Sequence, residues 1–323
     1  MEKNDNDIVM KSRSVSGAIT EGFRLYMDNF KRIFRFSWPG ALVFAIAAGA
    51  LNTYAVTELP RMELLLSSGR LTPTQQFAIL GQSYILGVFG LAVLLASVLF
   101  GSYGFSLLRQ HLATGTIAWP KSWFNFDGAT LWRTVKCYLC LLVICMVLGI
   151  VLSLFAILAA TVLHGVVGLA FFMLAMLAVV VLYMPLTYVC MRYMLTDGTG
   201  FWQQLGRGYS VGLRHLGFIF AILLVELAAV VLINFIVSIP SFILFSANML
   251  AQVGAISGDS LGMPSYMNSL TFVVFILAGL LTAYIGLSVM FPFYYMYGSI
   301  EKQEEEKQQA FPTPNNQHLT PNT

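Results

Sequence analysis

Glu226 is the residue of this chain with the clearest potential for chemistry. It lies in the apolar run Leu223–Ala228, where a carboxylate costs about 2.5–3.5 kcal/mol on membrane-insertion scales and is expected to face other helices. Asn234 follows about two helical turns later. Together these two residues predict an intramembrane proton or cation site. The alternative is a neutral Glu226 that hydrogen-bonds to a neighbouring hydroxyl or carbonyl group.

Neither the histidines nor the cysteines form a pattern that predicts a metal or redox centre. The four histidines are His111, His164, His215 and His318. The predicted topology places them at opposite membrane edges and in the tail, so we expect no shared metal. Cys137 and Cys140 have CxxC spacing, but no second CxxC or histidine pair accompanies them. We therefore expect these two cysteines to be packing residues within a span.

No catalytic motif occurs in a usable context. We find no HExxH, nucleophile elbow, Walker A sequence or dinucleotide-binding GxGxxG in a suitable place. Residues 197–200, Asp-Gly-Thr-Gly, are typical of a turn, and a phosphate cradle is the alternative. Paired acid and base groups, which an intramembrane enzyme needs, are also missing. The sequence predicts a protein without enzymatic activity, cofactor or metal.

A basic amphipathic segment, residues 14–35, precedes the first long apolar run. At helical spacing, one face carries Val15, Ile19, Phe23, Met27, Phe30 and Phe34. Basic residues lie on another face, and the candidate lipid-headgroup contacts are Arg24, Lys31, Arg32 and Arg35. A helix of this kind can lie in the headgroup zone of an anionic leaflet. It can equally be a juxtamembrane helix that packs on the bundle and orients it.

The composition is that of a membrane protein. Of the 323 residues, 58% are hydrophobic and 10% are charged, whereas soluble domains carry roughly 25% charged residues. No basic patch lies away from the apolar segments, which argues against a nucleic-acid partner. The first apolar run begins too late and is too long for a cleavable signal peptide.

Six apolar segments are long enough to cross a bilayer, which takes about 20 helical residues. We place these spans at 37–56, 77–108, 137–163, 166–194, 216–245 and 270–297. Thr72, Pro73 and Gln75 predict a capped helix start before the second span. The fold is predicted to be all-α. It comprises a flexible N-terminus, a membrane domain and a disordered polar tail, at 1–13, 14–300 and 301–323.

Lysine and arginine residues are strongly biased to one side of the predicted membrane. Of the 18 such residues, only Arg61 and Arg70 lie on one side, which leaves 16 on the other. Basic residues accumulate on the cytoplasmic side of membrane proteins. The bias therefore predicts a multi-pass protein with both termini in the cytoplasm.

The segments that precede the first and fifth spans are similar. Residues 21–23 and 207–209 align without gaps as Glu-Gly-Phe and Arg-Gly-Tyr. Pro185 and Pro292 stand near the ends of the fourth and sixth spans, where we expect each to kink its helix. These features predict three parallel units, each an amphipathic helix plus a helical hairpin, although residues 123–136 match poorly. The alternative is that similar sequences arise because every helix meets the same interface.

This lead-in and first span, with Glu-Gly-Phe at 21–23, Phe30, Ile-Phe at 33–34 and Trp-Pro at 38–39, resemble a group of bacterial six-span membrane proteins. The group includes the membrane domain attached to some glycerophosphodiester phosphodiesterases. The resemblance implies a bacterial cytoplasmic (inner) membrane protein. The soluble phosphodiesterase domain has no counterpart in this chain, so its activity is not implied. Mitochondrial carriers also contain three tandem hairpins, but their Pro-x-acidic-x-x-basic signature is absent from the first span.

The sequence predicts a scaffold or accessory protein that acts through lipid or protein contacts in the membrane. Its candidate partners are anionic lipids at the cytoplasmic face, a membrane protein and a second copy of the chain. The alternative is a transporter or permease for a small or amphipathic solute that uses Glu226. A coupled transporter usually carries several intramembrane polar groups, so a single carboxylate is weak support for transport.

Overall fold

The computed structural model describes residues 9–67, 72–119, 127–159, 161, 165–256, 264 and 266–310. Within these residues the regular secondary structure is entirely helical, which confirms the predicted all-α class. Within the described chain, six helical segments are long and apolar enough to cross a membrane, and the fourth of them is Gly165–Leu195. The protein therefore has the architecture of a multi-pass membrane protein with six spans.

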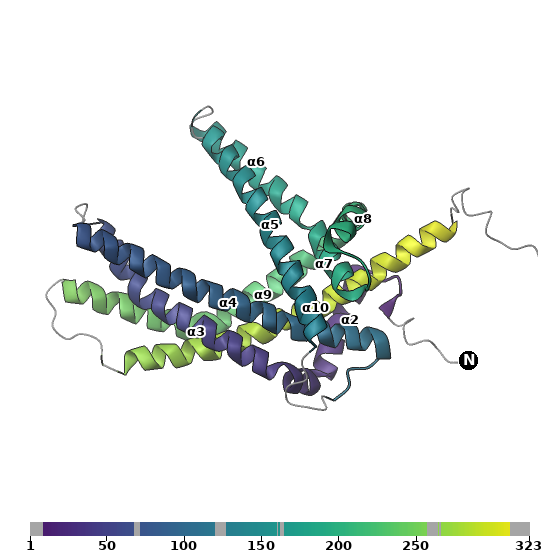
Figure 1. The fold of residues 1–323 in the computed structure, drawn as a ribbon, viewed down its shortest axis with the longest axis horizontal. Coiled ribbons are helices and arrows are strands. Elements are labelled where there is room, and N and C mark those ends of the chain that lie inside the picture. The colour runs from purple at the N-terminus through teal and green to yellow at the C-terminus, as the bar shows by residue number, and fades with distance from the viewer. Residues whose placement is uncertain are drawn as a thin grey trace, which may run out of the picture.

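Two groups of long helices diverge from a common base (Figure 1). The helices are α2 (Val15–Asp28), α3 (Phe30–Ser67), α4 (Pro73–Thr114), α5 (Gly128–Leu158), α6 (Gly165–Tyr183), α7 (Pro185–Leu195), α8 (Phe201–Arg214), α9 (Leu216–Ile256) and α10 (Met267–Ala310). Helices α3, α4, α9 and the first part of α10 extend together on one side, whereas α5 and α6 form a separate hairpin; the yellow end of α10 projects on the opposite side. Helices α2, α7 and α8 lie where the two groups meet, and we call these helices, with the parts of α4, α5 and α10 packed against them, the base.

The predicted lead-in helix over 14–35 is split in two at Asn29. The Asn29 amide side chain donates to the Leu25 carbonyl at 3.0 Å, and its backbone leaves the helical conformation. Residues from Phe30 onward therefore belong to α3, which starts seven residues before the predicted span at Ser37. Because α3 begins at Phe30, Pro39 lies inside this helix and not in its first turn.

The start of α4 agrees with the sequence pattern. The Thr72 hydroxyl accepts from the Gln75 N–H, and the Gln75 side chain accepts from the Thr72 N–H at 2.9 Å. Pro73 occupies the first turn, where its missing N–H leaves no intrahelical bond unmade. The capping box satisfies two N–H groups that otherwise have no helical partner, so the helix begins there.

The two span prolines behave differently. Pro185 separates α6 from α7, since α6 ends at Tyr183 and Met184 joins the two helices. Pro292, by contrast, lies within α10, which continues past it to Ala310. The fourth predicted span is therefore divided into two helices, whereas the sixth is a single one.

The predicted flexible N-terminus is packed over the part that the structure describes. Val9 is buried against Gly298, and the Arg13 N–H donates to the Ser299 hydroxyl at 2.9 Å. The Arg13 guanidinium also lies 4.7 Å from the centre of the Tyr295 ring. Residues 9–13 are thus held by α10, and the prediction of a flexible segment is wrong for them. Residues 1–8 lie outside the described chain.

The predicted disordered tail is helical up to Ala310, because ion pairs attach it to other helices. Glu301 pairs with Arg192 of α7 at 3.2 Å. Glu304 contacts His215, the residue between α8 and α9, at 2.9 Å. These contacts hold a polar extension of α10 against the base, so the prediction is wrong for 301–310. Residues 311–323 lie outside the described chain.

Close packing is concentrated in the base, where aromatic side chains of α7 and α10 are buried. Tyr188, Phe291 and Tyr294 are at most 1% exposed. The hairpin is different, since none of the most apolar stretch of α5 is buried, against 33% of the corresponding stretch of α3. Intramolecular packing therefore holds the base, and the hairpin leaves its apolar surface to the bilayer.

Helices α2 and α8 take corresponding places in the structure. Each has 14 residues and is followed, after one non-helical residue, by a long span. Gly22 of α2 lies against Pro292, and Gly212 of α8 lies against Pro185. The described part of the second predicted lead-in, from 128 to 136, is the beginning of α5 rather than a separate helix. The threefold repeat stays a prediction.

Candidate functional site

Glu226 is buried in the membrane-spanning part of α9. Glu226 is 2% exposed, and neither of its carboxyl oxygens has a hydrogen-bond partner among the described residues. Ile222 and Ile219, one and two turns earlier on α9, are fully buried as well. The hydrogen bond to a neighbouring group, which the sequence offered as the alternative for Glu226, is not formed within the described chain.

Asn234, unlike Glu226, has hydrogen-bond partners on α9 and α10. Its carbonyl oxygen accepts from the Thr282 hydroxyl of α10 at 2.9 Å, and its amide donates to the Val230 carbonyl at 3.0 Å. Eight residues separate it from Glu226, which corresponds to about 12 Å along a helix. Asn234 thus connects α9 to α10, and the two-residue site stays a prediction.

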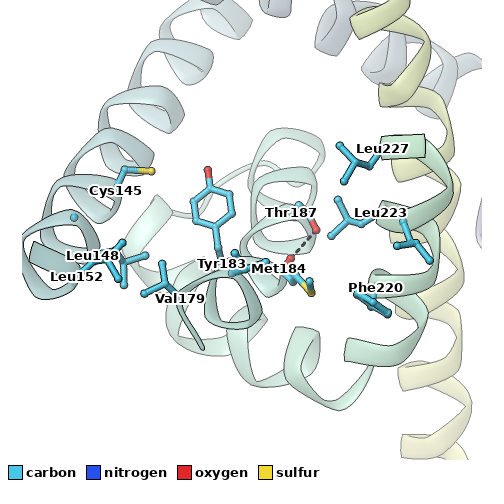
Figure 2. A pocket seen from close by; sticks show the side chains of 13 residues that line it. Cys145, Leu148, Leu152, Val179, Tyr183, Met184, Thr187, Phe220, Leu223 and Leu227 are labelled. Atoms are coloured by element: carbon cyan, nitrogen blue, oxygen red, sulfur yellow. Dashed lines mark hydrogen bonds between the residues drawn. The ribbon is translucent and has the colours of Figure 1, made fainter. Parts of the chain in front are cut away.

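An apolar cavity of about 580 Å³ opens between the α5–α6 hairpin and α9; we call it the hairpin cavity. Figure 2 shows Tyr183 between α5 and α9, with Leu223 and Leu227 on the α9 wall. The Thr187 hydroxyl, also on the lining, donates to the Met184 carbonyl at 2.8 Å. Glu226 does not line this cavity, although its neighbours on α9 do. The hairpin cavity can therefore accept apolar groups but offers them no charged partner.

The four candidate lipid contacts fall into two pairs. Arg24 and Lys31 are exposed, and Arg24 forms a 3.6 Å ion pair with Asp28 on the same helix. The Arg32 guanidinium donates to the Ile117 carbonyl at 2.8 Å. The guanidinium groups of Arg32 and Arg35 lie 5.6 and 5.8 Å from the centre of the Trp119 ring. The second pair therefore helps to hold the segment that follows α4.

The face of α2 that is most buried against α10 is not the predicted apolar face. Ala18, Gly22 and Tyr26 are buried, whereas Met27 of the predicted apolar face is 67% exposed. The Tyr26 hydroxyl donates to the Tyr284 carbonyl at 3.1 Å. Burial raises the pKa of Tyr26, and the neighbouring Tyr284 raises it further, so the hydroxyl stays a neutral donor. The juxtamembrane interpretation thus describes the contacts of α2.

The interactions that tie the base together were not visible in the sequence. Asp197, predicted to lie in a turn, accepts from Arg109 of α4 at 2.6 Å and from Arg133 of α5. Residues 88 and 64 positions away supply these two contacts. No local pattern reports such a pair, because the partners meet only after the helices have packed.

The histidines and cysteines can now be placed. His111 is buried, with its Nδ1 atom 3.0 Å from the Tyr294 hydroxyl, whereas His164 and His318 lie outside the described residues. Cys137 and Cys140 are free thiols on α5. Among the residues that the structure describes, no group of three His, Cys, Asp or Glu side chains is arranged to hold a metal ion.

Comparison with known proteins adds no assignment: no family model, curated protein or solved structure matches this chain. The resemblance to the bacterial six-span group therefore stays a prediction.

Proposed function

We propose that this protein is a non-catalytic scaffold or accessory protein of a bacterial cytoplasmic membrane, which acts through lipid and protein contacts. The observation that carries the proposal is the unequal packing of the molecule. The base is held by aromatic side chains and ion pairs, whereas the α5–α6 hairpin exposes its apolar surface. Such a molecule offers surfaces for lipids or for other membrane helices.

The use of the charged groups supports this proposal. Arg109 and Arg133 share Asp197, and Arg192 pairs with Glu301, so these groups join helices to one another. Glu226 lies outside the lining of the hairpin cavity. A reaction centre requires acid, base or nucleophilic groups that converge on one space. The bias of basic residues to one side further supports cytoplasmic termini.

Native mass spectrometry of the full-length protein from membranes tests the scaffold function. Wild type, Glu226→Gln and Glu305→Gln are compared, the last as an exposed glutamate with the same change of charge. We expect the three proteins to retain the same anionic lipids and no defined solute. A defined solute that is present in wild type and Glu305→Gln but lost from Glu226→Gln would overturn the proposal.

Transport is the second candidate, and the unpartnered carboxyl group of Glu226 is the observation that favours it. A buried group without a fixed partner can take up and release a proton or cation more easily than one held in an ion pair. Proton flux into proteoliposomes, driven by a potassium diffusion potential, tests this function. Flux that falls to the level of empty vesicles in Glu226→Gln, but not in Glu305→Gln, supports transport. Equal flux in both variants excludes a role for Glu226.

A further inference from the structure

A second cavity, of about 570 Å³, lies at the beginning of α5; we call it the basic cavity. Arg133 and Lys136 line it from α5, Tyr193 lines it from α7, and residues 198–202 line it from the start of α8. It is therefore formed where the hairpin meets the base. In contrast to the hairpin cavity, it contains two cationic side chains.

Arg133 lines the basic cavity and is held in place by its own contacts. Its guanidinium donates to the Asp197 carboxylate and to the carbonyl groups of Tyr193 and Thr196. It also lies 5.1 Å from the centre of the Tyr193 ring. These contacts hold the cation in place, and the cost of ordering its side chain is already met before any ligand binds.

Lys136 supplies a charge that no described acidic residue neutralises through an ion pair. Its Nζ atom lies 5.3 Å from the centre of the Trp132 ring and forms no ion pair with a described residue. Asp197, the acidic residue beside the cavity, is already shared by Arg109 and Arg133. The cavity thus has a net positive charge, and an anion can approach Lys136 without displacing a carboxylate.

The start of α8 adds to this positive potential. Its N-cap is Gly200, which has no side-chain hydrogen bond to the helix. A Cβ atom added to Gly198 or Gly200 would meet no other atom within 4 Å, so space is open beside this backbone. Helix N-termini carry partial positive charge and present N–H groups to anions. This contribution reinforces the two basic side chains.

The surroundings of the basic cavity are those of a membrane interface. Trp132 and Trp202, which flank it, are 60% and 58% exposed, as is usual for tryptophans at headgroup depth. Leu139 lines the cavity, and exposed apolar residues follow it along one face of α5. These residues are Val143, Met146 and Ile150. A ligand with an anionic head and hydrocarbon chains would match both the cavity and the strip.

We propose that the basic cavity binds the headgroup phosphate of an anionic phospholipid, between Lys136 and the start of α8, with the acyl chains along α5. The inference deepens the proposed lipid-binding function and rests on it only for the class of ligand. The strip that begins at Leu139 favours a lipid over free phosphate, because free phosphate has no use for an apolar surface. The site is separate from Arg24 on α2 and Lys31 on α3.

Titration of the full-length protein in detergent with defined lipids, followed by native mass spectrometry, tests the site. The probes are phosphatidylglycerol and, as the zwitterionic control, phosphatidylcholine with the same acyl chains. Lys136→Ala is expected to weaken phosphatidylglycerol binding about fivefold, as for the loss of one cation near a lipid phosphate. Lys136→Arg, which keeps the charge, is expected to restore binding to within about twofold of wild type.

Arg207→Ala is the matched control, since it removes one positive charge from an exposed position on α8 outside the basic cavity. We expect it to bind phosphatidylglycerol as wild type does. Equal loss in Arg207→Ala and Lys136→Ala would overturn the site, because binding would then follow total charge. Equal binding of phosphatidylcholine and phosphatidylglycerol would overturn it as well.

Two further measurements identify the source of the phosphate and its location. Millimolar inorganic phosphate is expected not to displace phosphatidylglycerol; complete displacement would show a site for free anions and overturn the lipid assignment. Phosphatidylglycerol with brominated chains is expected to quench Trp202, seen as a smaller quenched fraction in Trp202→Phe. Quenching that is unchanged in Trp202→Phe would place the lipid elsewhere. A solute lost from Glu226→Gln would overturn the scaffold function without affecting these results.

Discussion

The base of this protein and its α5–α6 hairpin are both built from apolar helices, yet they are packed in opposite ways. Phe291 and Tyr294 in the base are completely buried, whereas Ile150 and Leu154 in the hairpin are each 61% exposed. In a bilayer, an apolar side chain gains little by leaving lipid for another helix. Close packing therefore marks the places where the fold depends on specific contacts.

The base is held by hydrogen bonds between helices and by a close approach of two backbones. Tyr188 donates to Glu301 at 2.7 Å, and the backbone of α2 approaches that of α10 at Gly22. In membranes, small residues at contact points and hydrogen bonds between helices are what stabilise helix association. The difference teaches that the base specifies the structure, while the hairpin is free to offer a surface.

The largest contrast is expected from the same substitution made in each region. Leu287 of α10 is 1% exposed and Leu154 of α5 is 61% exposed. Leu287→Ala leaves a cavity among fixed neighbours and should lower the free energy of unfolding by about 2–4 kcal/mol. Leu154→Ala should cost less than about 0.5 kcal/mol, because lipid fills the space. Thermal unfolding in nanodiscs measures both. Equal losses would mean that the hairpin is covered by a partner or packed differently.

Replacing a glycine by alanine tests the close approach of α2 to α10. A Cβ atom at Gly22 would lie 2.5 Å from the backbone nitrogen of Pro292, so Gly22→Ala must push the helices apart. We expect a loss of about 1–3 kcal/mol. At Gly206 of α8 a Cβ meets nothing within 4 Å, and Gly206→Ala should be neutral or stabilising by up to about 1 kcal/mol. Melting temperatures that change alike in the two variants would argue against this contact.

The attachment of the α10 extension to the base should have an intermediate effect. Glu304→Gln removes the carboxylate that contacts His215 and Lys307, each at 2.9 Å. We expect a loss of about 1 kcal/mol and faster proteolysis after residue 300. Glu306→Gln, at an exposed position on the same extension, is the control and should behave as wild type. Cleavage at the same rate in all three proteins would show that the ion pairs do not hold the extension.

The smallest effect is expected at the start of the hairpin, where Asp127 caps α5. Its carboxylate accepts from the Thr130 hydroxyl and from the Ala129 N–H. The Thr130 hydrogen bond, opposed by partial burial, holds the pKa of Asp127 below its usual value of 3.8. A lowered pKa contributes stability that is present above the usual aspartate pKa and is lost as the pH falls through the folded-state pKa.

Asp127→Asn tests this effect, because asparagine keeps the cap but not the charge. At pH 7 we expect the variant to be less stable than wild type by under about 1 kcal/mol, and the difference to shrink as the pH falls toward about 3. Thermal melts of both proteins over this pH range measure it. A difference that widens as the pH falls would contradict the assignment.

The class of the fold was readable from the sequence because it depends on local properties. Apolar runs of sufficient length predicted six spans, and the Thr72 capping box predicted where α4 begins. Each feature involves residues within one segment, so neighbouring residues contain all the information. The boundaries were less accurate: α3 begins at Phe30 because Asn29 interrupts the helix. The charged segment 301–310 was predicted to be a disordered tail, because its ion-pair partners are distant in the sequence.

The candidate site depended on contacts that no local pattern contains. Hydropathy predicted that Glu226 would be buried, but only the packing of α9 showed that its carboxyl group lacks a partner among the described residues and lies outside the hairpin cavity. The basic cavity likewise exists because Lys136 of α5 meets the start of α8. Sequence determined which segments are helices and which enter the membrane. Tertiary structure decided which charges are paired, because ion pairs form between residues that approach only when the helices pack.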